Sequence, residues 1–370
     1  MRQARLTGAA GPFRSPNDPG CGTAEVAVRP DDERIYRSGP EPDLMGTPDA
    51  PDQTRVDAVV PVPAEVERTS GEYRLSTETD IRYDSAKARP VAEYLAGVLR
   101  PPTGYDLPLV EASRGDGTGG TDGSRDGHAT DAVSLSLSGP PSGLGDEGYR
   151  LDVTDTGATV RADDPAGLFR AVQTLRQLLP PAVESDRERS GPWSIPCVEI
   201  TDSPRFPYRG AHLDVARHFF TVDEVRAFVD LVALYKVNHL HLHLTDNEGW
   251  RLAIDGWPEL TGRGAETDVD GGDGGYFTQS DYEEIVAYAA SRYVTVVPEI
   301  DVPAHTGAAT AAYPDLSRGD PPASIPGDAG RLDVDAERTY EFLADVIEQV
   351  AELTPGPYVH VGADEADDMT

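Results

Sequence analysis

An alternation of short apolar segments with amphipathic helical segments after Pro204 constrains the fold of this chain most strongly. The strand-like segments are 209–216, 238–246, 294–301 and 358–365, and the helical segments between them are 221–237, 278–293 and 334–355. Strand segments separated in this way by helices are typical of parallel βα units. They predict either the first part of a closed (β/α)8 barrel or a doubly wound sheet. Both folds place their site at the carboxyl ends of the strands, so position alone does not choose between them.

The preceding part of the chain, residues 56–203, predicts a separate α+β domain with an antiparallel sheet and two helices. Residues 148–164 alternate as a hairpin does, with Asp-Thr-Gly at the turn. The Gly-, Asp- and Ser-rich stretch 114–131 is expected to be a flexible surface loop. Residues 1–55 show no period of either kind and are expected to be disordered. The second domain is then 204–370.

The charge of the chain limits its partners. It carries 65 acidic and 32 basic residues, for a net charge of −33, and its only lysines are Lys87 and Lys236. Nucleic acid is excluded as a partner because phosphate binding needs a basic surface. Acid-rich, lysine-poor surfaces suit molar salt, where self-repulsion is screened within about 3 Å at 1 M. We therefore expect a halophilic source, although an acidic surface by itself says nothing about substrate.

No segment has the character of a membrane span or an export signal. No apolar run approaches the roughly 20 residues that cross a bilayer. The first residues, MRQARLTGAAGPFRSP, are basic but lack the apolar core of a signal peptide. The expectation is a cytoplasmic protein, or a secreted one if the N-terminus is mis-assigned.

The two cysteines, Cys21 and Cys197, make neither a disulfide framework nor a metal cluster.

Polar residues follow each of the four predicted strands. They are Asp214, Arg217 and His218; Asp246, Glu248, Trp250 and Arg251; Glu299, Asp301 and His305; and His360, Asp364 and Glu365. A single strand-end Asp is often only a helix cap, but four such groups at one edge of a sheet indicate a site. Paired carboxylates can do acid–base work on a glycosidic bond. Adjacent strand residues face opposite sides, so Asp364 and Glu365 share a site only if the chain leaves the pleat, which Gly362 allows.

Five segments resemble the catalytic domain of glycoside hydrolase family 20, the β-N-acetylhexosaminidases. They read LDVARHFF, LHLHLTDNEGWR, GGYFTQSDYEEIVAYAASR, VVPEIDVPAHT and YVHVGADE, and they occur in the order of the family. Residues 56 to about 200 are similar to the α+β domain that precedes the barrel in that family. The resemblance implies the first four βα units of a TIM barrel, and the lysine-poor composition resembles a haloarchaeal member. The family resemblance also implies substrate-assisted cleavage with retention of the anomeric configuration. In this reaction the 2-acetamido oxygen of the substrate attacks the anomeric carbon to give an oxazolinium ion.

The resemblance implies a role for each site residue. Glu365 is the general acid and then the base for water, and Asp364 orients the acetamido group and stabilises its developing charge. His305 and Asp246 form a relay to Glu365, and Arg217 holds the hydroxyls at C3 and C4 with its fixed fork of donors. No metal or cofactor is implied. The expected partner is a glycan that ends in N-acetylglucosamine or N-acetylgalactosamine; the sequence defines no oligomeric state.

This sequence departs from the family pattern at three places. Ala363 and Ala304 stand where the family usually has glycine, and we expect both to be tolerated with a negative φ. The chain ends at Thr370, after the fourth βα strand, whereas the family carries further sugar ligands on later strands. An inactive, C-terminally truncated fragment is therefore the alternative hypothesis, and a glycosidase of another barrel family is a third.

Two motifs suggest metals on first inspection. Residues 268–275, DVDGGDGG, are similar to a calcium loop but lack its full spacing and its terminal bidentate Glu. His239, His241 and His243 lie on one face of a predicted strand, where a metal site is conceivable. Core packing and hydrogen bonds inside the barrel are the favoured interpretation of the three histidines.

Overall fold

The computed structural model describes residues 53–112, 131–137, 143–269, 271–323 and 330–366, all within one compact unit that spans 51–370. The predictions of disorder in 1–55 and of a flexible loop at 114–131 fall almost wholly outside these residues. At the boundary, helix α1 (Gln53–Asp57) begins inside the segment that was expected to lack structure. Its Arg55 donates from Nη1 to the carbonyl of Ser194 at 2.7 Å. A five-residue helix held by such a distant contact leaves no periodic pattern in the sequence.

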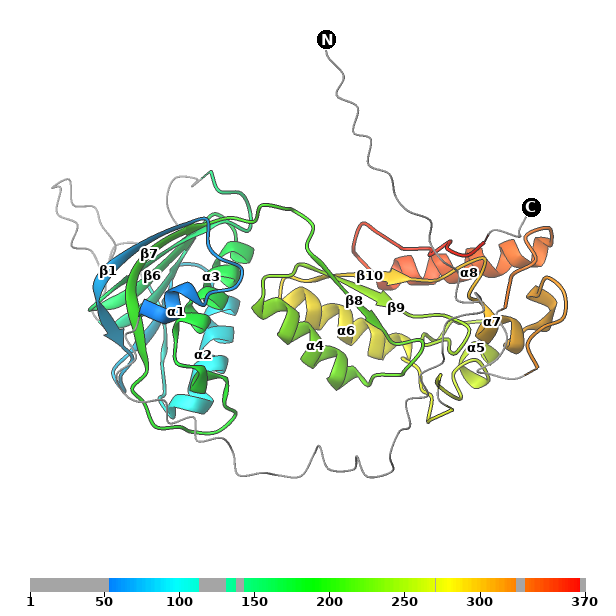
Figure 1. The fold of residues 1–370 in the computed structure, drawn as a ribbon, viewed down its shortest axis with the longest axis horizontal. Helices are drawn as coiled ribbons and strands as arrows, with labels where there is room; N and C mark the ends of the chain where they lie inside the picture. The colour runs from blue at the N-terminus through cyan, green and yellow to red at the C-terminus, as the bar shows by residue number, and fades with distance from the viewer. Residues whose placement is uncertain (1–52, 113–130, 138–142, 270, 324–329, 367–370) are drawn as a thin grey trace, which may run out of the picture. The chain divides into compact units, whose positions relative to one another are not determined.

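The first part of the described chain folds as a seven-stranded sheet with the order β1-β7-β5-β6-β4-β2-β3. Its strands are β1 (Glu65–Arg74), β2 (Asp80–Tyr83), β3 (Leu109–Glu111), β4 (Ala132–Ser136), β5 (Tyr149–Thr154), β6 (Gly157–Ala162) and β7 (Ser194–Asp202). The hairpin of β5 and β6 forms as predicted. Helices α2 (Arg89–Thr103) and α3 (Pro165–Leu178) pack on one face of the sheet (Figure 1).

The expectation of an antiparallel sheet is wrong for half of the strand pairs. The β1–β7, β7–β5 and β5–β6 pairs are antiparallel, but β6–β4, β4–β2 and β2–β3 are parallel. Parallel neighbours need a crossover connection, and α2 supplies one between β2 and β3. A hairpin is local in sequence, so its pattern is easily recognised. Strands that pair across a crossover are far apart in sequence, and no local pattern indicates their pairing.

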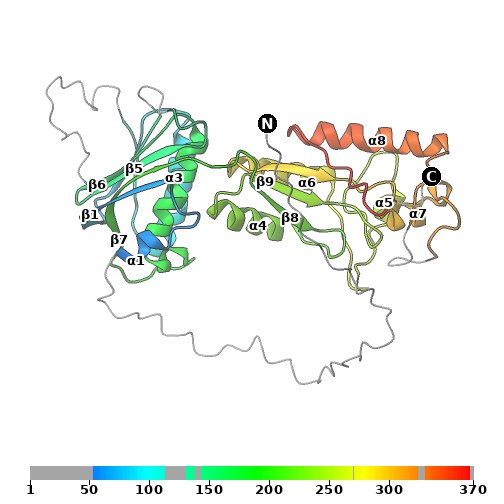
Figure 2. The same ribbon diagram turned by 45° about the horizontal axis from the view of Figure 1, so that its top comes forward.

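The second part contains a three-stranded parallel sheet in the order β10-β9-β8. The strands β8 (Gly210–Asp214), β9 (His239–His243) and β10 (Thr295–Glu299) alternate with helices α4 (Val222–Leu234) and α6 (Gln279–Ser291), and α8 (Glu337–Leu353) follows β10. Helices α4 and α6 lie side by side against the sheet (Figures 1 and 2). The predicted alternation is therefore confirmed. Shorter elements are η1 (Pro181–Glu184), α5 (Glu259–Gly262), α7 (Gly307–Ala312) and η2 (Pro314–Leu316).

The register of this sheet aligns three charged side chains in one row. Asp214 of β8 pairs with His243 of β9, and His243 pairs with Glu299 of β10. Because paired residues in neighbouring strands face the same side, these three side chains project together from the carboxyl end of the sheet.

The fourth predicted strand, 358–365, forms only one bridge, between Glu299 and His360. His360 N–H donates to the Pro298 carbonyl at 2.8 Å, and Val302 N–H donates to the Val361 carbonyl at 3.1 Å. The segment thus runs beside β10 in the parallel sense but pairs over a shorter length than predicted. The chain then leaves the pleat at Gly362, whose φ is +62°. This departure was expected, because both acids that follow must reach one site.

Two smaller expectations concern the membrane and the cysteines. Within the described ranges, no helix is both long and apolar enough to span a bilayer. Cys197 is a buried free thiol, while Cys21 lies outside the described residues.

Candidate active site

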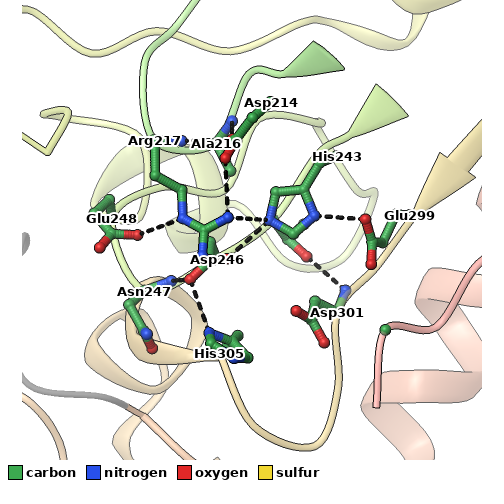
Figure 3. Close-up of polar contacts among 12 residues, drawn as sticks. Asp214, Ala216, Arg217, His243, Asp246, Asn247, Glu248, Glu299, Asp301 and His305 are labelled. Carbon is green, nitrogen blue, oxygen red and sulfur yellow. Dashed lines mark hydrogen bonds and ion pairs between the residues drawn. The ribbon is translucent and has the colours of Figure 1, made fainter. Parts of the chain in front are cut away.

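Arg217 lies just after β8 and is held by three carboxylates (Figure 3). Its Nη1 lies 2.9 Å from Asp214 Oδ2, its Nη2 2.7 Å from Asp246 Oδ2, and its Nε 3.3 Å from Glu248 Oε2. Oδ1 of Asp214 also accepts the backbone N–H of Arg217 at 2.9 Å, which fixes the turn. The side chain keeps 37% of its surface exposed. A guanidinium fixed in this way keeps N–H donors for a ligand, and its contact with sugar hydroxyls is a prediction.

Arg251 is fully buried and ties two loops together. Its guanidinium donates to the carbonyls of Val215, Ala216, Ala265, Thr267 and Gly275 at 2.7–3.4 Å. Burial lowers its pKa to about 10, although nearby carboxylates act against this. Two of the five carbonyls directly precede Arg217 in the chain, and Val269 N–H donates to the Arg217 carbonyl at 2.9 Å. The sequence pointed to Arg251 as a strand-end residue but gave it no task.

Behind Arg217 lies a buried hydrogen-bonded network that joins β9 to β10. His243 Nδ1 is 2.6 Å from Glu299 Oε2, and His243 Nε2 is 2.8 Å from Asp246 Oδ2. Glu299 also meets His241 Nε2 at 2.7 Å and His360 Nδ1 at 2.9 Å. The hydrogen bonds predicted for His241 and His243 are thus present. His239, at the other end of β9, stacks on Tyr208 and bonds to Asn238.

The network shifts the pKa values of its members apart. Burial alone lowers the pKa of His243, but hydrogen bonds to Asp246 and Glu299 outweigh it and raise the pKa to about 10. Burial raises the pKa of Glu299, but hydrogen bonds from His241 and His243 outweigh that effect and hold it far below its usual value. The pKa of Asp246 is also lowered, because donors from His243, the Asn247 backbone and Arg217 overcome its burial.

His305 connects this network to the acid pair. Its Nδ1 lies 3.3 Å from Asp246 Oδ1, and its Nε2 lies 3.5 Å from both Asp364 Oδ2 and Glu365 Oε2. In the part of the chain that the structure describes, Nε2 has these two ion-pair neighbours but no hydrogen-bond partner. The five residues nominated from sequence, Arg217, Asp246, His305, Asp364 and Glu365, are therefore brought to one place. The carboxylates of Asp364 and Glu365 are exposed, at 66% and 79% of their side-chain surface.

Asp301 supports the backbone on which the acid pair stands. It is buried, and its Oδ1 accepts the N–H of Ala363 at 3.3 Å. A Cβ placed on Gly362 would collide with the same carboxylate. Burial raises the pKa of Asp301 to about 6, and the charge of Asp364 adds to this shift. Asp301 was named among the strand-end residues, but its contact depends on the turn at Gly362 and could not be read from sequence.

Ala363 has a φ of +72°, so the negative φ on which its tolerance was expected to depend is not present. An L-residue in the left-handed region costs about 1–2 kcal/mol. The turn demands this conformation, because Gly362, Ala363 and Glu365 all have positive φ. At Ala304 φ is not positive, as expected.

Several groups of donors here are close enough to hold a metal ion. Their ligand atoms lie within 4.8 Å of one another in the sets His212, His241 and Glu299; His243, Asp246 and Asp301; and Asp301, His305 and Asp364. Most of these atoms already pair as imidazole and carboxylate, so the arrangement fits a hydrogen-bonded network. In the calcium-like loop, Asp268 is 3.1 Å from His218 Nδ1 and accepts the N–H of Gly272 at 2.7 Å.

Comparison with known proteins gives this site a family. The model of glycosyl hydrolase family 20, domain 2, matches residues 57–203, and the model of the catalytic domain of the same family matches residues 206–370. The chain belongs to glycosyl hydrolase family 20.

Curated relatives and solved structures agree with this assignment. A β-N-acetylhexosaminidase of Cellulomonas fimi is 44% identical over 248 residues, which are 65% of this chain and 48% of the relative. A β-hexosaminidase of Porphyromonas gingivalis is 35% identical over 313 residues, 83% of this chain and 38% of the relative. The family 20 β-N-acetylhexosaminidase structure from Streptomyces coelicolor A3(2) has a TM-score of 0.76 at 49% identity, over 84% of this chain and 60% of that one. The chain thus spans about half or less of these two curated relatives.

Proposed function

We propose that this chain provides the acid–base centre of a retaining β-N-acetylhexosaminidase that hydrolyses terminal β-linked N-acetylglucosamine or N-acetylgalactosamine. The observation that carries the proposal is the position of His305, whose Nε2 lies 3.5 Å from both Asp364 and Glu365 while its Nδ1 faces Asp246. A ring placed between a buried carboxylate and an exposed acid can tune proton transfer by that acid. Family membership and the β-hexosaminidase relatives support the same substrate class.

The proposed reaction has two steps. In the first, the acetamido oxygen of the substrate attacks the anomeric carbon, and Glu365 gives its proton to the departing glycosidic oxygen. Asp364 orients the acetamido group and stabilises the positive charge that develops on its nitrogen. In the second, the Glu365 carboxylate takes a proton from water, whose oxygen opens the oxazolinium ion with net retention. Arg217 contacts the C3 and C4 hydroxyls from the end of β8.

The fold proposal follows the same reasoning. Strands β8, β9 and β10 and the segment around His360 are the first four strands of a (β/α)8 barrel. Residues 56–203 are a separate α+β domain, and residues 204–370 are the first half of the barrel domain. Parallel strands in sequential order with intervening helices support this arrangement. The site lies at their carboxyl ends, as it does in such barrels.

The charge of the chain supports a working environment of high salt. With a net charge of −33, self-repulsion opposes the compact state unless salt screens it. We place the enzyme in molar salt for this reason.

The test compares substrates that differ only in the acetamido group. In molar salt the chain should release 4-nitrophenol from the aryl N-acetyl-β-glucosaminide and N-acetyl-β-galactosaminide, but not from the aryl β-glucoside, which lacks the internal nucleophile. Glu365→Gln should lower kcat on the N-acetyl substrates at least about 100-fold, the scale of general acid catalysis. The matched control is Glu352→Gln, an exposed glutamate on α8. Cleavage of the glucoside at a similar rate, activity that survives Glu365→Gln, or a folded chain inert on both N-acetyl substrates would overturn the proposal.

A further inference from the structure

His243 has no part in the two chemical steps, yet it occupies the centre of the charged row across β8, β9 and β10. Its side chain is buried, with 5% of its surface exposed. Each ring nitrogen faces a different carboxylate: Nδ1 lies 2.6 Å from Glu299, and Nε2 lies 2.8 Å from Asp246 (Figure 3). Side chains from β10 and from the loop after β9 therefore converge on one imidazole.

We infer that His243 is a positioning residue, an imidazolium that holds the carboxylate of Asp246 in place for His305. Glu299 anchors the opposite side of the ring. The alternating series of carboxylates and imidazoles that ends at Glu365 is thereby two residues longer than the sequence suggested. This inference rests on the proposed function for its catalytic meaning, but the charge and contacts of His243 can be measured without it.

The contacts of the ring require two protons. A neutral imidazole has one N–H donor and one acceptor nitrogen, whereas an ionised carboxylate can only accept. Two carboxylates at 2.6 and 2.8 Å are satisfied together only by a doubly protonated ring. Charge-assisted hydrogen bonds of this kind are shorter and stronger than neutral ones. The raised pKa of His243, about 10, agrees with this geometry despite the cost of burial.

The charges around His243 favour its protonated form, which is a second cation beside Arg217. The titratable or charged groups that face His243 are Asp214 and His212 from β8, Arg217 after β8, His241 from β9 through Glu299, Asp246 after β9, and Glu299 and Asp301 from β10 and its end. Arg217 Nη1 carries two N–H bonds, and it approaches both Asp214 at 2.9 Å and His243 Nε2 at 3.1 Å. The contact of His243 Nε2 with the Asp246 carboxylate is shorter, at 2.8 Å, and is made to an anion. We therefore assign the Nε2 proton to the shorter contact with Asp246.

The consequence reaches His305 through the two oxygens of Asp246. Oδ2 is taken by His243 at 2.8 Å and Arg217 at 2.7 Å, and Oδ1 accepts the Asn247 N–H at 2.6 Å and faces His305 Nδ1 at 3.3 Å. A carboxylate held at both oxygens stays ionised and cannot rotate. Since it can only accept, His305 must place a proton on Nδ1. Its Nε2 is then the nitrogen available to the acid pair.

The first experiment needs no activity. Long-range ¹H–¹⁵N NMR on the uniformly labelled chain reports the protonation of each of its eight histidines, with assignments from single His→Gln variants. Both nitrogens of His243 should remain protonated from pH 6 to 8.5. Asp246→Asn and Glu299→Gln should each lower the midpoint of His243 by at least about one pH unit, because each removes one anion in direct contact. A His243 ring that titrates near pH 6.5 in the unmodified chain overturns the inference, whatever the fate of the proposed function.

The second experiment separates positioning from simple stability. His243→Gln removes the charge but keeps a side-chain donor, and its kcat/KM profile should move its alkaline limb to higher pH by about half a unit. The reason is that loss of a nearby cation favours the protonated form of an acid. The control is His239→Gln on the same strand, which touches neither Asp246 nor Glu299. A profile that keeps its position in His243→Gln, with only a uniform loss of rate, assigns His243 a purely structural role and refutes the inference.

Discussion

Replacing Gly362 with alanine should displace the acid pair while leaving the rest of the protein folded. The new Cβ would lie closer than 3.0 Å to the Asp301 carboxylate and 3.1 Å from its Cα. One of the two partners must move by about 1.5 Å to restore an ordinary separation. Asp301 is 3% exposed, and its N–H donates to Thr245 Oγ1 at 3.0 Å. The exposed segment that carries Asp364 and Glu365 is therefore the part that moves.

The magnitude of this effect can be separated into a backbone cost and a collision. Gly362 has a φ of +62°, so any L-residue there costs about 1–2 kcal/mol. Gly256 has a φ of +86° with open space around its Cβ position, and Gly256→Ala is the matched control with the same backbone cost alone. Both variants should lose a similar 1–2 kcal/mol at most in denaturant unfolding. Only Gly362→Ala should lose about 100-fold in kcat, the usual result of misplacing a catalytic group by about 1 Å.

A second measurement keeps the Gly362 prediction independent of turnover. Burial and the charge of Asp364 raise the pKa of Asp301 to about 6. When the segment moves away, this carboxyl gains solvent and loses its charged neighbour, so its pKa should fall toward the ordinary value. Carbon-detected NMR titration of Asp301 can follow the change. An unchanged Asp301 titration together with full activity in Gly362→Ala would refute the reasoning.

Three further predictions follow from the buried charges and the net charge. Arg251→Lys should raise KM about tenfold with kcat within a few-fold, because one ammonium cannot span the five carbonyls that fix the loop before Arg217; the exposed Arg263→Lys is its control, and equal losses in kcat would argue for general damage. Because burial raises the folded-state pKa of Asp301 to about 6, above the 3.8 of an unperturbed Asp, ionisation of this carboxyl destabilises the fold increasingly as pH rises through that window. Asp301→Asn should therefore flatten the pH dependence of the unfolding free energy and gain up to about 3 kcal/mol above pH 6. Dialysis from molar to millimolar salt should reduce the helical circular dichroism signal, and an unchanged spectrum would contradict the salt-adapted surface.

The parts of the fold that were predicted correctly are those that nearby residues determine. A capping box of Thr221 and Glu224 begins α4, and a similar box of Thr278 and Asp281 begins α6. Strand pairing across a crossover depends on contacts far apart in sequence, so the parallel half of the first sheet was missed. The fourth strand was overestimated because its pattern says nothing of how long the chain stays beside β10.

The candidate site divides in the same way. Strand-end position nominated a larger set of polar residues, because βα folds gather such residues at one edge. The family resemblance then singled out Arg217, Asp246, His305, Asp364 and Glu365 from that set. The contacts among them depend on turns and on register, which a linear pattern does not contain. The positive φ of Ala363, the contacts of Asp301 and the five carbonyls around Arg251 all arise from loops that meet only in the folded chain.

The row of Asp214, His243 and Glu299 has a consequence for how β9 finds its place. If β9 slipped by one residue, Leu242 or Leu244 would stand between the two carboxylates, and His243 would turn to the opposite face of the sheet. Glu299 would then be a buried anion without its closest cation, which costs several kcal/mol. Hydrophobic packing tolerates one leucine in place of another, but this row does not tolerate a leucine in place of the imidazolium. The charges that serve the site thus also favour one register of β9 over its neighbours. A chain with the wrong register would have a higher free energy, so folding would favour the native alignment.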